Sequence, residues 1–217
     1  MSDLDEIQPT RRLKVVVLLS GSGRTLENFI RANHDGRISI EIARVISSRA
    51  KVRGIEIARQ ADIPLSIVPR RSFVTPEAFS DAVHEILDLE EPDLVLMAGF
   101  LSKIAIPPPF EGKVMNIHPA LLPLFGGQGN YGHRVHQRVL ESGMKVTGCT
   151  VHSVDEHYDA GPIILQSCVP VFEDDDAGTL GARVFARECE LYPEAIRLFG
   201  AGRLRVEGRR VKILSPA

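Results

Sequence analysis

Residues 14–30 read KVVVLLSGSGRTLENFI. The apolar run at residues 14–19 is suited to a strand that is buried on both faces of a sheet. Ser20-Gly-Ser-Gly23 then turns the chain into a helix that carries Leu26 and Phe29 on one side. A buried strand followed by a tight turn and an amphipathic helix is the repeating unit of a parallel sheet covered by helices.

The same alternation continues along the chain. Apolar and β-branched runs predict strands at residues 40–46, 65–68, 93–98 and 113–117. Helical patterns predict a helix at residues 51–61 and another that begins at the Thr75-Pro76 cap. Because such sheets place ligands at the carboxyl ends of their strands, the expected site lies at residues 20–25, 99–101 and 116–118.

The pattern changes after Pro119, where a glycine-rich loop precedes a helix near residues 133–141. Strands at residues 146–154 and 162–171 are expected to pair as a ribbon, before a helix at 177–200 and a hairpin at 204–214. We therefore predict an α/β fold, with a Rossmann-like, mostly parallel sheet, helices on both faces and an added antiparallel β-ribbon. Residues 13–217 are expected to form a single domain after a frayed or disordered N-terminus at residues 1–12.

Composition narrows the function classes. A net charge of −2, with 44% hydrophobic and 25% charged residues, is ordinary for a globular protein and favours neither a nucleic acid nor a membrane as partner. No apolar run approaches the roughly 20 residues of a membrane helix, and the polar start lacks the apolar stretch of a signal peptide. Three widely spaced cysteines form no CxxC pair or disulfide framework, which favours a reduced, cytoplasmic location.

The turn at residues 20–25, SGSGRT, lies between a predicted strand and the start of a helix. Free backbone N–H groups and the helix dipole favour an anion there. The third glycine of a dinucleotide-binding GxGxxG is missing, and no GK[ST] follows as in a P-loop. The alternatives are a tight structural turn and a site for a single phosphate.

Asn116 and His118 end a predicted strand on the same face, about 6–7 Å apart along the chain. An amide donor beside an imidazole can hold an oxyanion while a proton moves. The other interpretation is a strand-end histidine that is satisfied by the backbone.

Residues 155–162, DEHYDAGP, place three carboxylates and a histidine in one turn. They form either a solvated loop or a loop from which one carboxylate reaches His118 and raises its pKa. His118, His152, His157 and Asp159 are permissible metal ligands, but no HxH or HExxH spacing supports a metal site, so none is expected.

Glu188 falls on the apolar stripe of the last predicted helix. A carboxylate there is costly without a partner. It either reaches solvent at the border of the stripe or receives the ammonium or amide group of a ligand.

Five segments occur in order along the chain: SGSGRTLENFI, LMAGFLSKI, NIHPALLP, GCTVHSVDEHYDAGPIILQ and ARVFARECELYPEAI. Together they resemble the glycinamide ribonucleotide formyltransferases of folate-dependent purine synthesis, over residues 14–214. The resemblance implies the formyltransferase fold, 10-formyl-tetrahydrofolate as the co-substrate that donates the formyl group, and the amine of a small sugar-phosphate as the acceptor.

The resemblance also implies residue roles. The catalytic group is His118 with Asn116 and Asp159. The ribonucleotide is bound at its phosphate and its glycinamide end by Gly23, Arg24, Thr25 and Glu188. The folate is bound by Leu101, Ser102, Lys103, Ile104, Asn116 and Asp155, of which the last lies in the loop that covers the pterin.

Three features depart from the best-known members of that family. Arg24-Thr25 stands where they carry Ser-Asn, and the loop at residues 124–132 is several residues longer. Pro76 replaces a basic residue that often contacts the folate, and Lys103 or Arg70 is a candidate substitute.

Other functions are compatible with the same residues. Formyl-tetrahydrofolate deformylases hydrolyse the same donor but usually carry a regulatory domain of ~80 residues before the first strand, where about a dozen residues stand here. Relatives that act on tRNA or sugar amines carry an additional domain. A non-catalytic binding module and a nucleotide-dependent dehydrogenase are the alternatives from other classes, and both a monomer and a homodimer fit the sequence.

Overall fold

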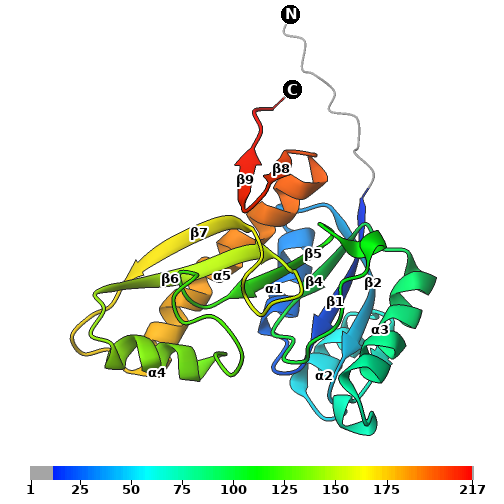
Figure 1. Cartoon of the computed structure of the whole chain (residues 1–217), viewed down its shortest axis with the longest axis horizontal. Helices are drawn as coiled ribbons and strands as arrows, with labels where there is room; N and C mark the ends of the chain where they lie inside the picture. Colours follow the sequence, from blue (N-terminus) through cyan, green and yellow to red (C-terminus); the bar gives the residue numbers. More distant parts are fainter. Residues whose placement is uncertain (1–11, 217) are drawn as a thin grey trace, which may run out of the picture.

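Strand β1 (Leu13–Leu19) lies within a nine-stranded sheet of order β3-β2-β1-β4-β5-β6-β7-β9-β8, in a computed structural model that describes residues 12–216 (Figure 1). The predicted frayed N-terminus falls, except for Arg12, outside the described residues. Strands β1 to β5 run parallel, as predicted. The other four of these strands are β2 (Ile40–Ser47), β3 (Leu65–Ile67), β4 (Leu94–Met97) and β5 (Val114–His118).

Helices cover both faces of this parallel half, which confirms the predicted layers (Figure 1). Alternate residues of β1 enter different apolar clusters, because successive side chains of a strand point to opposite faces. Val15 and Val17 pack with helices α1 (Arg24–His34), α2 (Arg53–Gln60) and α5 (Ala177–Gly200). Val16 and Leu18 pack with α3 (Pro76–Glu90) on the other face.

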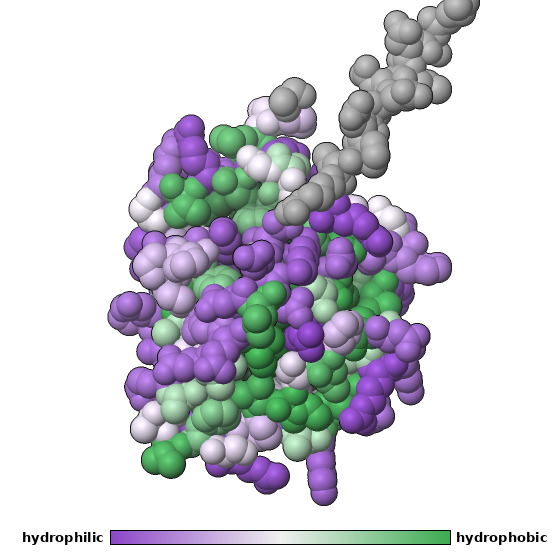
Figure 2. Space-filling view, turned by 90° about the vertical axis from the view of Figure 1, so that its right-hand side faces the viewer, coloured by the Kyte–Doolittle hydropathy of each residue, from purple (hydrophilic) through white to green (hydrophobic). Residues whose placement is uncertain are grey.

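The α3 helix begins as predicted, since the Thr75 hydroxyl accepts a hydrogen bond from the N–H of Ala78 at 3.1 Å. Two short 3₁₀ helices, η1 (Arg70–Ser72) and η2 (Pro108–Phe110), lie in connecting segments. On the face that forms the right-hand side of Figure 1, hydrophobic residues reach the surface between hydrophilic ones (Figure 2). Much of the surface of a folded protein is apolar, so this feature by itself does not identify a site.

The second half of the sheet is antiparallel, as the predicted ribbon required. Strand β6 (Val146–Ser153) pairs antiparallel with both β5 and β7 (Ile163–Pro170). Helix α4 (His133–Glu141) packs with α5 over this ribbon through a third apolar cluster. The closing hairpin of β8 (Leu204–Glu207) and β9 (Arg210–Ile213) joins the sheet through a parallel pair between Ile163 and Arg210.

The strand order reverses direction between β1 and β4, and the carboxyl ends of these strands meet there. The N–H of Ser20 donates to the carbonyl of Gly99 at 3.1 Å, and the Ser20 hydroxyl accepts from the N–H of Leu101 at 2.9 Å. The buried Tyr192 hydroxyl donates to the Met115 carbonyl at 2.8 Å, beside Asn116. These bonds hold the strand ends around the crevice where such sheets bind ligands. Among residues 12–216, no helix has the length and hydropathy needed to cross a membrane.

Candidate active site

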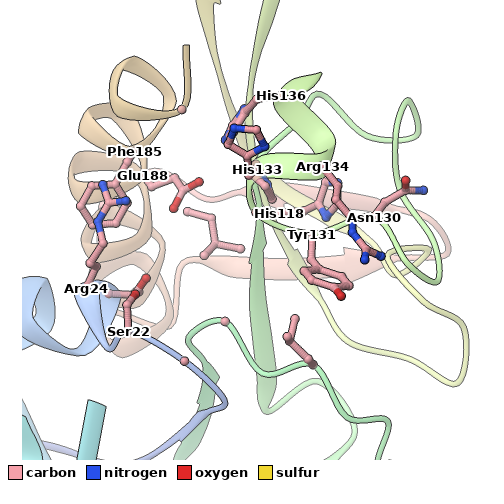
Figure 3. A pocket seen from close by; sticks show the side chains of 18 of the residues that line it. Ser22, Arg24, His118, Asn130, Tyr131, His133, Arg134, His136, Phe185 and Glu188 are labelled. Atoms are coloured by element: carbon pink, nitrogen blue, oxygen red, sulfur yellow. The ribbon is translucent and has the colours of Figure 1, made fainter. Parts of the chain in front are cut away.

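A cavity of about 740 Å³ opens at the carboxyl ends of β1, β4 and β5 (Figure 3). The N-terminal ends of α1, α4 and α5 also reach it, through Arg24, His133 and Ala177. Eight of the predicted site residues line this one cavity: Gly23, Arg24, Thr25, Leu101, Asn116, His118, Asp159 and Glu188. Tertiary folding therefore brings together groups that lie up to 165 residues apart, from Gly23 to Glu188 (188 − 23).

The glycine turn supplies the anion-binding side of the cavity. Gly23 adopts a φ of 74°, and a Cβ there would lie 2.5 Å from the Cα of Gly54, so only glycine fits. Within the described part of the chain, no side chain makes a capping hydrogen bond at the start of α1. The N–H groups of its first turn are therefore available to an anion, beside the side chains of Arg24 and Thr25.

Glu188 faces the same cavity from α5. Burial raises the pKa of its carboxyl to about 7, and the positive charge of Arg24 opposes this shift only in part. The side chain has no hydrogen-bond partner among residues 12–216. Such a carboxyl is suited to bind an amide or ammonium group of a ligand. Of the two alternatives that the sequence left open, this one is contact with a ligand and not with solvent.

Asn116, His118 and Asp159 converge on the opposite side of the cavity. The Nδ1 atom of His118 lies 3.4 Å from Asp159 Oδ2, and the Asn116 Nδ2 atom lies 3.5 Å from Asp159 Oδ1. The other ring nitrogen of His118, Nε2, lies 2.9 Å from the carbonyl oxygen of Phe125. Because a carbonyl only accepts, Nε2 carries a hydrogen, and Nδ1 is the nitrogen that can gain or lose a proton.

The net shift of the His118 pKa is opposite to the expected rise, although the carboxylate itself acts in the expected direction. Burial, with only 3% of His118 exposed, is the largest influence and lowers its pKa. Asp159 raises the pKa, as expected, but by less than burial lowers it. The sequence pattern predicted the position of the carboxylate, but it contained no information on how far the imidazole of His118 would be shielded from solvent.

The pKa of Asp159 is lowered. Burial by itself would raise it, but the neighbouring His152 ring, the interaction with His118 and the N–H of Gly127 together outweigh burial. The Gly127 N–H donates to Asp159 Oδ2 at 2.9 Å. Asp159 is therefore ionised and positioned by the glycine-rich loop.

Two groups around this centre were missed at the sequence level. His152, which the sequence offered only as a metal ligand, is 2% exposed and lies 3.2 Å from Asn116 Nδ2 and 3.6 Å from Asp159 Oδ1 through its Nε2 atom. The antiparallel register of β5 and β6 pairs it with Asn116, and this pairing could have indicated the contact. The second group is Phe185, whose ring lies against Arg24 in the cavity.

Only some of the residues predicted to bind the folate line this cavity. Leu101 and Asn116 line the cavity, whereas Ser102, Lys103, Ile104 and Asp155 do not. Ile104 is 3% exposed and packs in the apolar cluster with Phe79, so its backbone is the part that can reach a ligand. The role of these residues stays a prediction.

Neighbouring contacts indicate what three of the other candidates do in this structure. Lys103 Nζ lies 5.8 Å from the ring centroid of Tyr158, which lines the cavity. The Asp155 carboxylate accepts a hydrogen bond from the N–H of His157 at 2.8 Å and so shapes its own loop. Arg70 donates to the carbonyl of Phe73 at 2.9 Å. Among the described residues, no group of three or more His, Cys, Asp or Glu side chains is arranged to hold a metal ion.

Comparison with known proteins gives a consistent result. Residues 13–196 match the formyl transferase family. The chain is 40% identical over 197 residues to phosphoribosylglycinamide formyltransferase of Haemophilus influenzae, covering 89% of this chain and 90% of that protein. It is 38% identical over 202 residues to the trifunctional purine biosynthetic protein adenosine-3 of Bos taurus, covering 92% of this chain and only 19% of that protein.

Among solved structures, that of glycinamide ribonucleotide transformylase 1 from Symbiobacterium toebii superposes with a TM-score of 0.86 at 41% identity. The match covers 96% of each chain. The chain therefore spans nearly all of the Haemophilus influenzae and Symbiobacterium toebii proteins and about a fifth of the trifunctional Bos taurus protein.

Proposed function

This chain belongs to the formyl transferase family, and we propose that it transfers the formyl group of 10-formyl-tetrahydrofolate to the amine of N1-(5-phospho-D-ribosyl)glycinamide. The reaction is a step of de novo purine (IMP) biosynthesis. The observation that carries the proposal is that one cavity holds both an uncapped glycine turn with Arg24 and the group of Asn116, His118 and Asp159.

The ribonucleotide binds with its phosphate at the turn. The free N–H groups at Gly23 and Thr25 and the guanidinium of Arg24 are donors for phosphate oxygens. Glu188 then accepts from the glycinamide end of the substrate. This orientation directs the amine toward Asn116 and His118.

The chemistry is direct acyl transfer without a covalent enzyme intermediate. The substrate amine attacks the formyl carbon, and the oxyanion that forms lies between the Asn116 amide and the His118 ring. His118 is largely neutral at pH 7 because burial lowers its pKa, so its Nδ1 atom can take the proton of the attacking amine. Asp159 stabilises the resulting imidazolium at 3.4 Å.

Collapse of the intermediate breaks the bond between the formyl carbon and N10 of the folate. The proton passes to N10 through His118, Asp159 and a water molecule. Long contacts of 3.4–3.5 Å leave these groups free to bind the reacting atoms, as is common before substrates bind. Holding both substrates in line supplies several kcal/mol of the barrier reduction.

The folate lies along Leu101 and Asn116, with Ser102, Lys103 and Ile104 offering backbone groups and Asp155 shaping the loop over the pterin. The partners are these small molecules, and the protein acts in the cytoplasm, where its three free cysteines stay reduced. Residues 13–217 act as one catalytic domain.

The test is absorbance-monitored consumption of 10-formyl-tetrahydrofolate, with and without the ribonucleotide. Consumption that requires the ribonucleotide, and disappears in His118→Ala, supports the transfer. An equal rate without the ribonucleotide makes the protein a hydrolase of the donor. Folate binding with no consumption at all makes it a binding module, and either result overturns the proposal.

A further inference from the structure

The guanidinium of Arg24 lies on an aromatic ring. Its Cζ atom is 3.7 Å from the ring centroid of Phe185, which is direct stacking contact (Figure 3). Arg24 begins α1 directly after the glycine turn, whereas Phe185 lies in the middle of α5. The stack therefore joins the phosphate end of the cavity to the helix that carries Glu188.

Within residues 12–216, the Arg24 side chain has no hydrogen bond or ion pair. Its position is set by the ring, and its N–H donors stay available. Phe185 in turn belongs to none of the three apolar clusters of the described chain. A phenylalanine that fills a core would belong to one, so its contact with Arg24 is the interaction that the structure gives it.

The stack also separates two opposite charges. Phe185 and Glu188 are three residues apart, so they share one side of α5, and Figure 3 shows both beside Arg24. Arg24 is close enough to influence the ionisation of Glu188, yet no ion pair within 4.0 Å joins them. An arginine free to pair with that carboxylate would neutralise both groups, and neither would then be available to a ligand.

We infer that Phe185 is a positioning residue that holds the Arg24 guanidinium over the glycine turn and apart from Glu188. One end of the cavity thus keeps a cation for a phosphate monoester, while the other keeps a carboxyl for the nitrogen-bearing end of the same molecule. This inference rests on the proposed function, since it assigns a residue of the ribonucleotide subsite.

The test measures KM and kcat for the ribonucleotide, at saturating folate, in Phe185→Leu, Phe185→Tyr, Arg24→Gln and the double variant Arg24→Gln/Phe185→Leu. Loss of the ring in Phe185→Leu is expected to raise the ribonucleotide KM about 3- to 20-fold with little change in kcat or in the folate KM. Phe185→Tyr keeps the ring and restores a KM near that of the parent protein. The double variant should have the same KM as Arg24→Gln, because the ring acts only through the arginine.

The chain offers a control contact that involves the same helix. The Arg183 guanidinium lies 4.1 Å from the ring centroid of Phe172, and neither residue lines the cavity. Phe172→Leu removes an arginine–phenylalanine contact that lies outside the cavity, where Arg183 is also paired with Asp175, and should leave both KM values unchanged. An unchanged ribonucleotide KM in Phe185→Leu, or KM effects that add in the double variant, would overturn the inference.

A binding measurement separates this inference from the proposed function. Calorimetric titration with ribose 5-phosphate reports the phosphate subsite without turnover. Weaker binding in Phe185→Leu, and not in Phe172→Leu, supports the stack even if no ribonucleotide-dependent transfer is seen, which would contradict the proposed function alone. Equal binding by both variants and the parent protein contradicts the role of Phe185.

Discussion

The Nδ1 atom of His118 lies 3.4 Å from the Oδ2 atom of Asp159. Because the opposite ring nitrogen donates to the Phe125 carbonyl at 2.9 Å, Nδ1 is the nitrogen through which a proton can pass. The carboxylate that stabilises the charged ring is itself held by the N–H of Gly127 at 2.9 Å. The glycine-rich loop thus fixes both partners from its backbone.

Removing either partner is expected to abolish most turnover. His118→Ala and Asp159→Asn should each lower kcat by about 10²–10⁴-fold, because proton transfer through a positioned group contributes that much. Circular dichroism and melting temperature should show that the fold is kept. Near-normal kcat in either purified, folded variant contradicts the assigned roles.

The pH dependence of the reaction should report His118. Neutral His118 accepts the proton, so kcat should fall as pH decreases through its pKa, which burial sets below 6.5. Asp159 is the largest influence that raises this pKa, so Asp159→Asn should move the acid limb to lower pH. Titration of the imidazole signals by NMR, together with the residual activity of the variant, measures the shift. If the acid limb of the kcat–pH profile moved to higher pH in Asp159→Asn, a group other than His118 would be responsible for it.

Glu188 should make stability depend on pH near neutrality. A carboxyl whose pKa is raised in the folded state, here from 4.5 to about 7, stabilises the fold fully below the unfolded value. This contribution is lost as pH rises through about 7. The melting temperature of Glu188→Gln should therefore exceed that of the parent protein by a margin that grows from about pH 5 to about pH 8.5. Each kcal/mol of charge burial that the substitution relieves should raise the melting temperature by roughly 2–4 °C. Parallel melting curves across that range would show that the carboxylate is solvated.

A side chain at Gly126 should disturb the packing of the loop before α4 against Asp159. A Cβ there would lie 2.7 Å from the Cδ2 atom of Leu122 and 3.2 Å from the Cβ of Asp159. Gly126→Ala should push the loop away from Asp159 and lower kcat by up to about 10²-fold, since a misplacement of about 1 Å can cost that much. Leu124→Ala, at an exposed residue of the same loop, is the control that should retain activity. Equal kcat in the two variants contradicts the coupling.

His152 should act on the rate through Asn116 and Asp159. Its Nδ1 atom lies 2.9 Å from the Ser153 carbonyl, which fixes the ring so that Nε2 faces both groups. His152→Phe should lower kcat by about 10- to 100-fold and change neither KM, because His152 does not line the cavity. His34→Phe, at a side chain 88% exposed, should have no effect. A rise in KM instead of a loss in kcat would place His152 in contact with a ligand.

Local patterns were enough to predict most of the secondary structure. The predicted helices at 133–141 and 177–200 match α4 and α5, and residues 21–25, 99–101 and 116–118, at the expected strand ends, line the cavity. These features depend on apolar periodicity, on caps and on the rule for parallel sheets, all of which are properties of neighbouring residues. The closing hairpin was also predicted, but its contact with β7 was not, because strand pairing between distant segments leaves little trace in one sequence.

The sequence by itself determined which residue types are present for the chemistry: the glycine turn, Asn116 with His118 on one face of a strand, and an acidic turn that carries Asp159. Only the tertiary structure decided how these groups act. Burial reversed the expected direction of the His118 pKa shift, the register of β5 and β6 set His152 against Asn116, and the packing of α5 beside α1 put Phe185 under Arg24. The physical reason is that desolvation and contact between remote segments depend on distances in space, which the order of residues along the chain does not contain.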